Sequence, residues 1–148
     1  MANEAIYAWG TVKTLEASGA SITNGAIVQA NDASYDTVVD GSNYPDAVFV
    51  LKLQFATITS IENKVIGLYA RPKNIDGANH APAPTTTFME KYIGSFTLQA
   101  GAVNVDQYLI LAAEDLPKEA DYYLVNLSGQ TVTSGWALKV TPRTYKAA

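Results

Sequence analysis

The chain of 148 residues contains no cysteine and has 14 acidic and 10 basic residues, which gives a net charge of −4. This length favours a single domain that buries about 70% of the surface of its unfolded chain. The composition excludes disulfides, thiolate metal sites and thiol catalysis, and the lack of a basic run argues against nucleic acid as a partner, because phosphates are bound by clustered Lys and Arg.

The N-terminal part of the chain is a series of short pieces. Residues 1–20 are a candidate arm with strand-like segments at 5–9 and 11–15. No basic leader with an apolar core opens the sequence, and no apolar run approaches the ~20 residues that cross a bilayer, so we expect synthesis in the cytoplasm and no membrane partner. Asn24-Gly25, flanked by apolar residues, predicts a tight hairpin with a type I′ turn.

The stretch from 47 to 58 is the clearest strand in the sequence. Large apolar residues occupy its odd positions, whereas polar residues enter at its even positions. Successive side chains of a strand point to opposite faces, so this alternation predicts a central strand with one buried face. We expect it to form an antiparallel hairpin with 64–71, because Glu62-Asn63 predicts a turn between them. The apolar residues are Phe49, Leu51, Leu53 and Phe55.

Residues 72–91 show no hydrophobic period and contain Pro72, Pro82 and Pro84. An irregular loop of about twenty residues inside a compact domain is uncommon and is usually functional or disordered. We therefore expect this Pro-rich loop to reach a partner.

Four further strand candidates follow at 92–98, 107–113, 122–127 and 135–145. The segment 107–113 is apolar on both faces, which predicts a strand inside a sheet. No window has the i, i+3, i+4, i+7 stripe of a helix. The sequence predicts an all-β protein, a single antiparallel β-sandwich over residues 1–148 with jelly-roll or Ig-like strand order, an extended N-terminal arm and one long Pro-rich loop.

No catalytic, cofactor-binding or metal site is visible in the sequence. The lone histidine, His80, has neither a Gly-x-Ser-x-Gly elbow nor partners at metal-ligand spacing, so we interpret it as an exposed loop residue. An acidic cluster at 114–121 offers carboxylates for Ca²⁺ or for a glycosidase pair, but it fits a solvated turn better. We therefore predict a binding or structural module and no enzyme. The acidic residues are Glu114, Asp115, Glu119 and Asp121.

Four segments of the chain share a resemblance to one class of protein. The segments are Met1 to Gly10, Leu68 to Gly77, Asp115-Leu-Pro to Asp121-Tyr-Tyr-Leu, and Gly135 to Ala147. They resemble small virion structural proteins of tailed bacteriophages. Among such proteins, the resemblance implies a head decoration, or cement, protein. Copies of it would lie on the exterior of the expanded capsid as a homo-oligomer, commonly a trimer, and bridge subunits of the major capsid protein. Synthesis would take place in the host cytoplasm.

On this interpretation the partner contacts come from the N-terminal segment and the Pro-rich loop. These segments lack a strand period of their own and are suited to adding to the sheet edge of a neighbour. The candidate partner-binding residues are Ile6, Tyr7, Trp9, Tyr44, Pro72, Asn74, His80, Pro82, Pro84 and Phe88.

Two alternatives stay open. One is another virion part of similar size, such as a tail-tube, tail-terminator or head–tail joining protein, which would assemble as a ring. The other is a host-surface module that binds glycans through Tyr7, Trp9 or Tyr44, because exposed aromatic rings stack on sugars.

Overall fold

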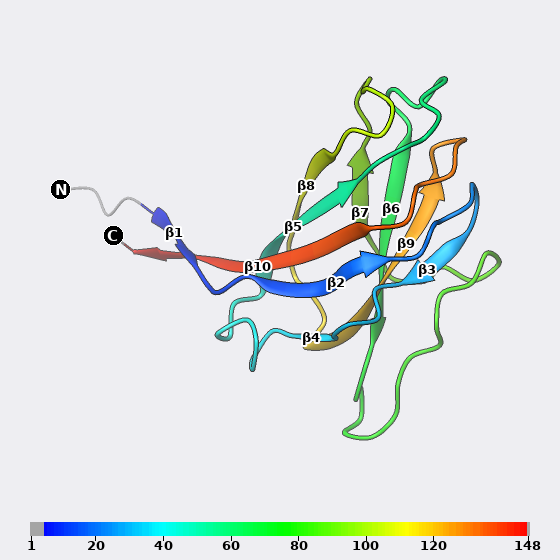
Figure 1. The fold of residues 1–148 in the computed structure, drawn as a ribbon. Helices are drawn as coiled ribbons and strands as arrows, with labels where there is room; N and C mark the ends of the chain where they lie inside the picture. The colour runs from blue at the N-terminus through cyan, green and yellow to red at the C-terminus, as the bar shows by residue number, and fades with distance from the viewer. Residues whose placement is uncertain (1–4, 148) are drawn as a thin grey trace.

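The computed structural model describes residues 5–147, which form ten β-strands and no helix. Figure 1 shows two antiparallel sheets packed face to face, with a two-stranded arm projecting from the body. The strands are β1 (Ala5–Trp9), β2 (Lys13–Gly19), β3 (Ile27–Gln29), β4 (Tyr35–Asp36), β5 (Asp46–Leu53), β6 (Val65–Pro72), β7 (Tyr92–Thr97), β8 (Gln107–Ala113), β9 (Glu119–Leu127) and β10 (Trp136–Ala147).

The strand order is that of a jelly roll. The first sheet runs β1-β10-β5-β8, with β2 also paired to β10, and the second runs β3-β9-β6-β7, with β4 also paired to β9. From β2 onward the chain changes sheet at every connection except within the broken strand β3/β4 and between β6 and β7. An Ig-like sandwich instead keeps its first two strands in one sheet. The predicted antiparallel β-sandwich is confirmed. Of the two strand orders that the sequence leaves open, jelly-roll and Ig-like, the structure has the jelly-roll order.

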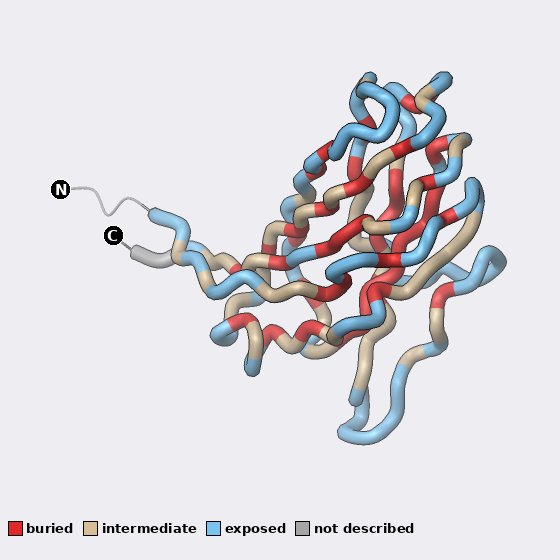
Figure 2. The backbone as a smooth tube through the Cα atoms, viewed as in Figure 1, coloured by how far each residue is buried: buried red, intermediate tan, exposed pale blue. Residues whose placement is uncertain are grey.

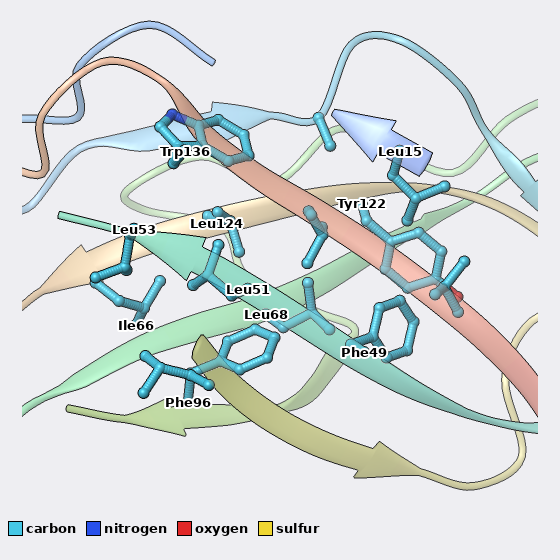
Figure 3. Packing of buried hydrophobic residues seen from close by; sticks show 14 of the residues in the cluster. Leu15, Phe49, Leu51, Leu53, Ile66, Leu68, Phe96, Tyr122, Leu124 and Trp136 are labelled. Carbon is cyan, nitrogen blue, oxygen red and sulfur yellow. The ribbon is translucent and has the colours of Figure 1, made fainter. Parts of the chain in front are cut away.

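The core lies between the two sheets and is built around β5. Phe49, Leu51 and Leu53 are at most 1% exposed, whereas the even residues between them are half-buried. Figure 3 shows these side chains facing those of β6 and β9, and the ring centroids of Phe49 and Tyr122 lie 4.9 Å apart. Figure 2 shows the same alternation of burial along the central strands, whereas none of residues 6–9 and 143–145 of the arm is buried. The predicted buried face of the central strand is confirmed.

The predicted Asn24-Gly25 hairpin is wrong, although a turn forms at that position. The Ala26 N–H donates to the Thr23 carbonyl at 3.1 Å, and of the two turn residues only Gly25 has a positive φ, of 80°. That geometry is a type II turn rather than a type I′ turn. The flanking segments do not pair with each other, because Ile22 bridges to the segment before β10 and β3 pairs with β9. The turn therefore passes the chain from one sheet to the other.

The predicted hairpin between 47–58 and 64–71 is also wrong. β5 lies between β10 and β8 in the first sheet, whereas β6 lies between β9 and β7 in the second. Each of the two strands has one apolar face, and placing them in opposite sheets buries both faces against the same core. The residues between them cross the end of the sandwich.

β8 is an edge strand and not the interior strand that its sequence predicts. Within the described chain it pairs with β5 alone. Tyr108 and Ile110 point to the outer face of the first sheet and are 64% and 71% exposed. Burial inside the protein therefore does not explain why the outer face of β8 is apolar.

Replacing Phe49 with alanine is expected to lower the free energy of unfolding by about 3–5 kcal/mol, because the change removes a fully buried ring and leaves a cavity between the sheets. Urea denaturation followed by circular dichroism measures the loss. Phe88→Ala is the matched control, since this ring in the Pro-rich loop is 42% exposed and its removal should cost less than about 1 kcal/mol. Equal losses at the two positions would contradict the described core.

The free energy of unfolding is expected to fall in alkali. Burial, and to a smaller extent the charges of Asp40 and Asp36, raise the pKa of the Tyr35 hydroxyl from 10.0 to about 12. Between these two values the unfolded chain releases a proton that the folded protein retains. Rising pH therefore favours unfolding, by up to about 1.4 kcal/mol per pH unit for each retained proton. Burial also raises the pKa of Tyr122, which adds to the effect.

The measurement for this alkaline effect is urea unfolding on both sides of the ordinary tyrosine pKa. Tyr35→Phe should reduce the dependence of stability on pH, because the variant no longer has this buried ionisable hydroxyl. An unchanged slope in the variant would show that Tyr35 does not cause the alkaline loss.

Candidate interaction site

The arm is a two-stranded ribbon made from the two ends of the described chain. β1 pairs antiparallel with the C-terminal end of β10 in continuous register from Ala5↔Ala147 to Trp9↔Arg143. On its other side β10 pairs with β5 only as far as Arg143, opposite Asp46. Beyond that point the ribbon leaves the body without a third strand (Figure 1). A two-stranded ribbon is marginally stable by itself in water, so the arm is suited to packing on another surface.

At the root of the arm Gly10 packs against Pro142. The Gly10 N–H donates to the Pro142 carbonyl at 2.7 Å, and a Cβ added at Gly10 would lie only 2.6 Å from Pro142 Cγ. Side chains do not approach so closely, so glycine is required for β1 to follow β10 here. β2 takes over the same edge of β10 from Lys13, opposite Val140. The root therefore fixes the direction in which the arm leaves the body.

One face of the arm carries a group of side chains, Tyr7, Trp9, Arg143 and Tyr145, that we name the arm cluster. The ring centroid of Tyr7 lies 4.5 Å from that of Tyr145 and 5.8 Å from that of Trp9. The Arg143 guanidinium carbon lies 4.6 Å from the centroid of the Tyr7 ring, within cation–π range. The hydroxyls of Tyr7 and Tyr145 form a hydrogen bond, which raises the pKa of Tyr145. The cluster ties the two strands of the arm together.

The arm cluster is exposed in spite of its apolar content. Trp9 and Tyr145 are each 55% exposed and Tyr7 is 40% exposed, while Ile6 on the opposite face is 43% exposed. Trp, Tyr and Arg are the residues most enriched in the energetically important parts of protein interfaces. Because Arg143 lies over the Tyr7 ring, that ring is less accessible to a sugar than a bare aromatic platform would be. In composition the arm cluster therefore resembles the centre of a protein interface more than a bare sugar-stacking platform.

The Pro-rich loop is fastened to the body and to itself. The Lys73 N–H donates to the Glu119 carbonyl at 2.8 Å, which fixes the start of the loop to β9. Further along, hydrogen bonds from Asn79 and then from Ala78 lower the pKa of Asp76 to about 2. A hollow of about 140 Å³ lies between the loop and the end of β6, lined mainly by apolar side chains. The loop is thus an ordered projection with its own internal bonds.

The sequence-predicted partner residues fall on three separate parts of the molecule. Ile6, Tyr7 and Trp9 lie on the arm, Tyr44 is half-buried in the connection between β4 and β5, and the other six lie from the end of β6 through the Pro-rich loop. In Figure 1 the arm and the loop leave the body in different directions. These residues therefore do not form one continuous site.

Within the loop the predicted residues differ in exposure. Pro84 is buried, which packs it into the loop rather than leaving it open to a partner as the sequence predicts. His80 is exposed, as expected of a loop residue, and its Nδ1 accepts a hydrogen bond from the Asn74 N–H at 3.2 Å. Phe88 remains 42% exposed. Ile75 and Met89, which are not among the sequence-predicted residues, are 63% and 40% exposed, so the loop presents apolar groups of its own.

Two of the four carboxylates in the acidic cluster at 114–121, those of Glu119 and Asp121, are engaged by other side chains. Lys73 Nζ lies 3.9 Å from Glu119 Oε1 and 3.7 Å from Asp121 Oδ1, and Ser34 Oγ donates to Asp121 at 2.5 Å. The other two acidic residues are exposed in the connection between β8 and β9. Within residues 5–147, no group of three or more His, Asp or Glu side chains is placed to share a metal ion. The engaged carboxylates hold the base of the Pro-rich loop against β9.

Sequence reasoning missed Arg143 and Tyr145 as parts of the site. Both lie in a stretch that was correctly expected to be a strand, but their contacts are with Tyr7 and Trp9 at the other end of the chain. The alternation of Arg143 and Tyr145 was visible in the sequence. What the sequence does not contain is the pairing of β1 with β10, which places these side chains beside the N-terminal aromatic residues.

No known family model and no curated protein matches this chain. In the part of the chain that the structure describes, no helix has the length and apolar character needed to span a membrane. Interpretation of function therefore depends on the geometry and chemistry of the arm.

The backbone amides at the tip of the arm are expected to exchange with solvent about 100-fold faster than those of β5, because a two-stranded ribbon opens without unfolding the core. Hydrogen exchange followed by mass spectrometry, in dilute protein and on peptides from residues 5–9, measures the difference. Equal protection of the two regions would contradict an arm that projects uncovered from the body.

Proposed function

We propose that this protein is a decoration protein of a tailed-bacteriophage head, without enzymatic activity, that binds the outside of the expanded capsid and bridges subunits of the major capsid protein. The observation that carries the proposal is the projecting arm, whose aromatic and cationic cluster is left largely exposed. The resemblance of four sequence segments to virion proteins supports the phage assignment.

The arm and the body suit two different parts of this task. The jelly-roll body is close-packed and therefore holds the root of the arm in a fixed direction. The free edge of β1 can add to an exposed sheet edge of a capsid subunit, so that main-chain hydrogen bonds supply affinity and the arm cluster supplies specificity. Covering the exposed part of one aromatic ring contributes on the order of 2 kcal/mol.

Stabilisation of the capsid follows from mass action. A protein that binds the expanded lattice but not the compact one shifts the equilibrium toward the expanded state in proportion to its free concentration relative to its Kd. The pressure of packed DNA pulls capsid subunits apart, and a bound bridge opposes that separation.

Co-sedimentation with phage heads that lack the protein, in compact and in expanded forms, tests the proposal. Saturable binding to expanded heads alone is the expected result. Binding to neither form would contradict it, and a ring-shaped assembly on phage tails would favour the tail or head–tail joining alternative.

The double variant Tyr7→Ala with Trp9→Ala is expected to weaken head binding by about 100-fold or more, because both rings are interface anchors on the arm. Tyr92→Ala is the matched control, since this tyrosine of β7 is 54% exposed but lies away from the arm. These substitutions leave the core intact, whereas deleting residues 2–15 would remove Leu15, which is fully buried. Unchanged binding by the double variant would show that the arm does not hold the capsid.

A host-surface glycan-binding module is the second candidate, favoured by the 55% exposure of Trp9. It predicts binding to a glycan array that is lost in Trp9→Ala, together with no binding to heads.

A further inference from the structure

β8 is an unprotected sheet edge. It pairs with β5 in unbroken register along all seven residues from Gln107 to Ala113. In the described chain, no backbone hydrogen bond joins residues 108–112 to any segment other than β5. The strand contains no charged residue, proline or glycine, which are the devices by which natural edge strands avoid pairing with other chains. Its free backbone groups are therefore available to another strand.

Apart from the short arm strand β1, the other sheet edges of the described chain are interrupted. The register of β7 with β6 shifts between Leu68 and Tyr69, and the register of β2 with β10 shifts at two places. On the remaining edge β3 and β4 are two short strands separated by a break. β8 is thus the edge strand along which a strand of another chain could pair regularly over the longest stretch.

The outer face of β8 is apolar as well as exposed. Tyr108 is 64% exposed and Ile110 is 71% exposed, and Ile110 lies opposite Val50 of β5. The inner side of the strand faces the core, with Leu109 only 4% exposed. A strand added at this edge would cover the flank of Tyr108 and Ile110 and would continue the first sheet.

We propose that two copies of this chain associate through β8, pairing antiparallel about a two-fold axis at Ile110. Ile110 is the middle of the seven-residue strand, so this register uses the whole strand in both copies. It places Ile110 opposite Ile110 and the large Tyr108 opposite the small Ala112 of the other copy. A shift of one residue would set outward-facing side chains against inward-facing ones and is excluded by the pleat.

The strand is uncharged between the two ends of the proposed ladder. Just beyond those ends the register sets Asp106 of one copy opposite Glu114 of the other. Both carboxylates are exposed to solvent, where water and salt screen their repulsion. The nearest cation is Lys52, which lies opposite Tyr108 on β5. The two copies of Lys52 would be at least three strand spacings apart, about 14 Å, because they are also offset along the strands. This separation exceeds the screening length of about 8 Å at physiological ionic strength.

This association is independent of the proposed binding to capsids, because it uses the sheet edge opposite the arm. An isologous pairing of one edge with itself closes at two copies. It therefore differs from the trimer that the resemblance to decoration proteins implies.

Ile110→Cys tests the proposed axis directly, since the chain has no other cysteine. Antiparallel neighbours have Cα atoms about 4.5–5.5 Å apart, which a disulfide spans. Mild oxidation is expected to convert this variant to a covalent dimer. Ile75→Cys is the matched control, because Ile75 is an isoleucine of the Pro-rich loop that is 63% exposed, and it should remain monomeric on denaturing gels. Equal cross-linking of the two variants would overturn the proposal.

Sedimentation equilibrium provides the second test. The unmodified chain is expected to sediment as a dimer, and Ile110→Lys should weaken the association by about tenfold or more, because two like charges then face each other across the axis. Ile75→Lys should leave it unchanged. Urea unfolding checks that both variants fold. A monomer or a trimer of the unmodified chain, or a dimer that Ile110→Lys leaves intact, would overturn the proposal.

Discussion

The fold and the arm both depend on one strand, β10. Its first half is paired on both sides, by β2 and by β5, and Trp136 at its start is 1% exposed with its indole N–H donating to the Ala20 carbonyl at 2.7 Å. Its last residues continue out of the sandwich and pair with β1 alone. The arm therefore has no core of its own, and its direction is set by a strand that the core holds in place. A change that loosens β10 in the body would also reorient the arm.

The first sheet has chemically different edges. On one side β1 presents aromatic rings beside Arg143 of the neighbouring strand β10, and on the other side β8 presents an uncharged strand with exposed Tyr108 and Ile110. The first edge suits a partner that contributes acceptors or carboxylates to the guanidinium, whereas the second suits a strand of its own kind. Because these edges are separated by β10 and β5, contacts at both are sterically compatible. In the two contacts that we propose, the jelly roll would act as the spacer between them.

The sequence was informative where the physics is local. Alternation along β5 identified its buried face, and the absence of a helical stripe identified the fold class. The sequence does not indicate which of the two sheets each strand joins. The turn residues at Gly25 and after β5 are compatible both with a hairpin inside one sheet and with a connection that crosses to the other sheet. The sequence predicts an interior position for β8, whereas the structure has it at a sheet edge. The prediction fails because an apolar face has the same residues whether the protein buries it or leaves it exposed. Arg143 and Tyr145 were missed because their partner Tyr7 lies 138 residues away from Tyr145 in sequence.

The meeting of Ala5 and Ala147 at the tip of the arm determines how the chain can be re-engineered. A short turn joining the two ends would convert the open ribbon into a closed hairpin, since cross-strand neighbours need only a few linking residues. New ends opened at the exposed residues around Gly77 would give a circular permutant that retains every strand pair of the sandwich. By the same geometry, a fluorescent fusion joined at Ala5 or Ala147 would start at the tip of the arm, whereas one inserted in the Pro-rich loop would leave the body in another direction (Figure 1).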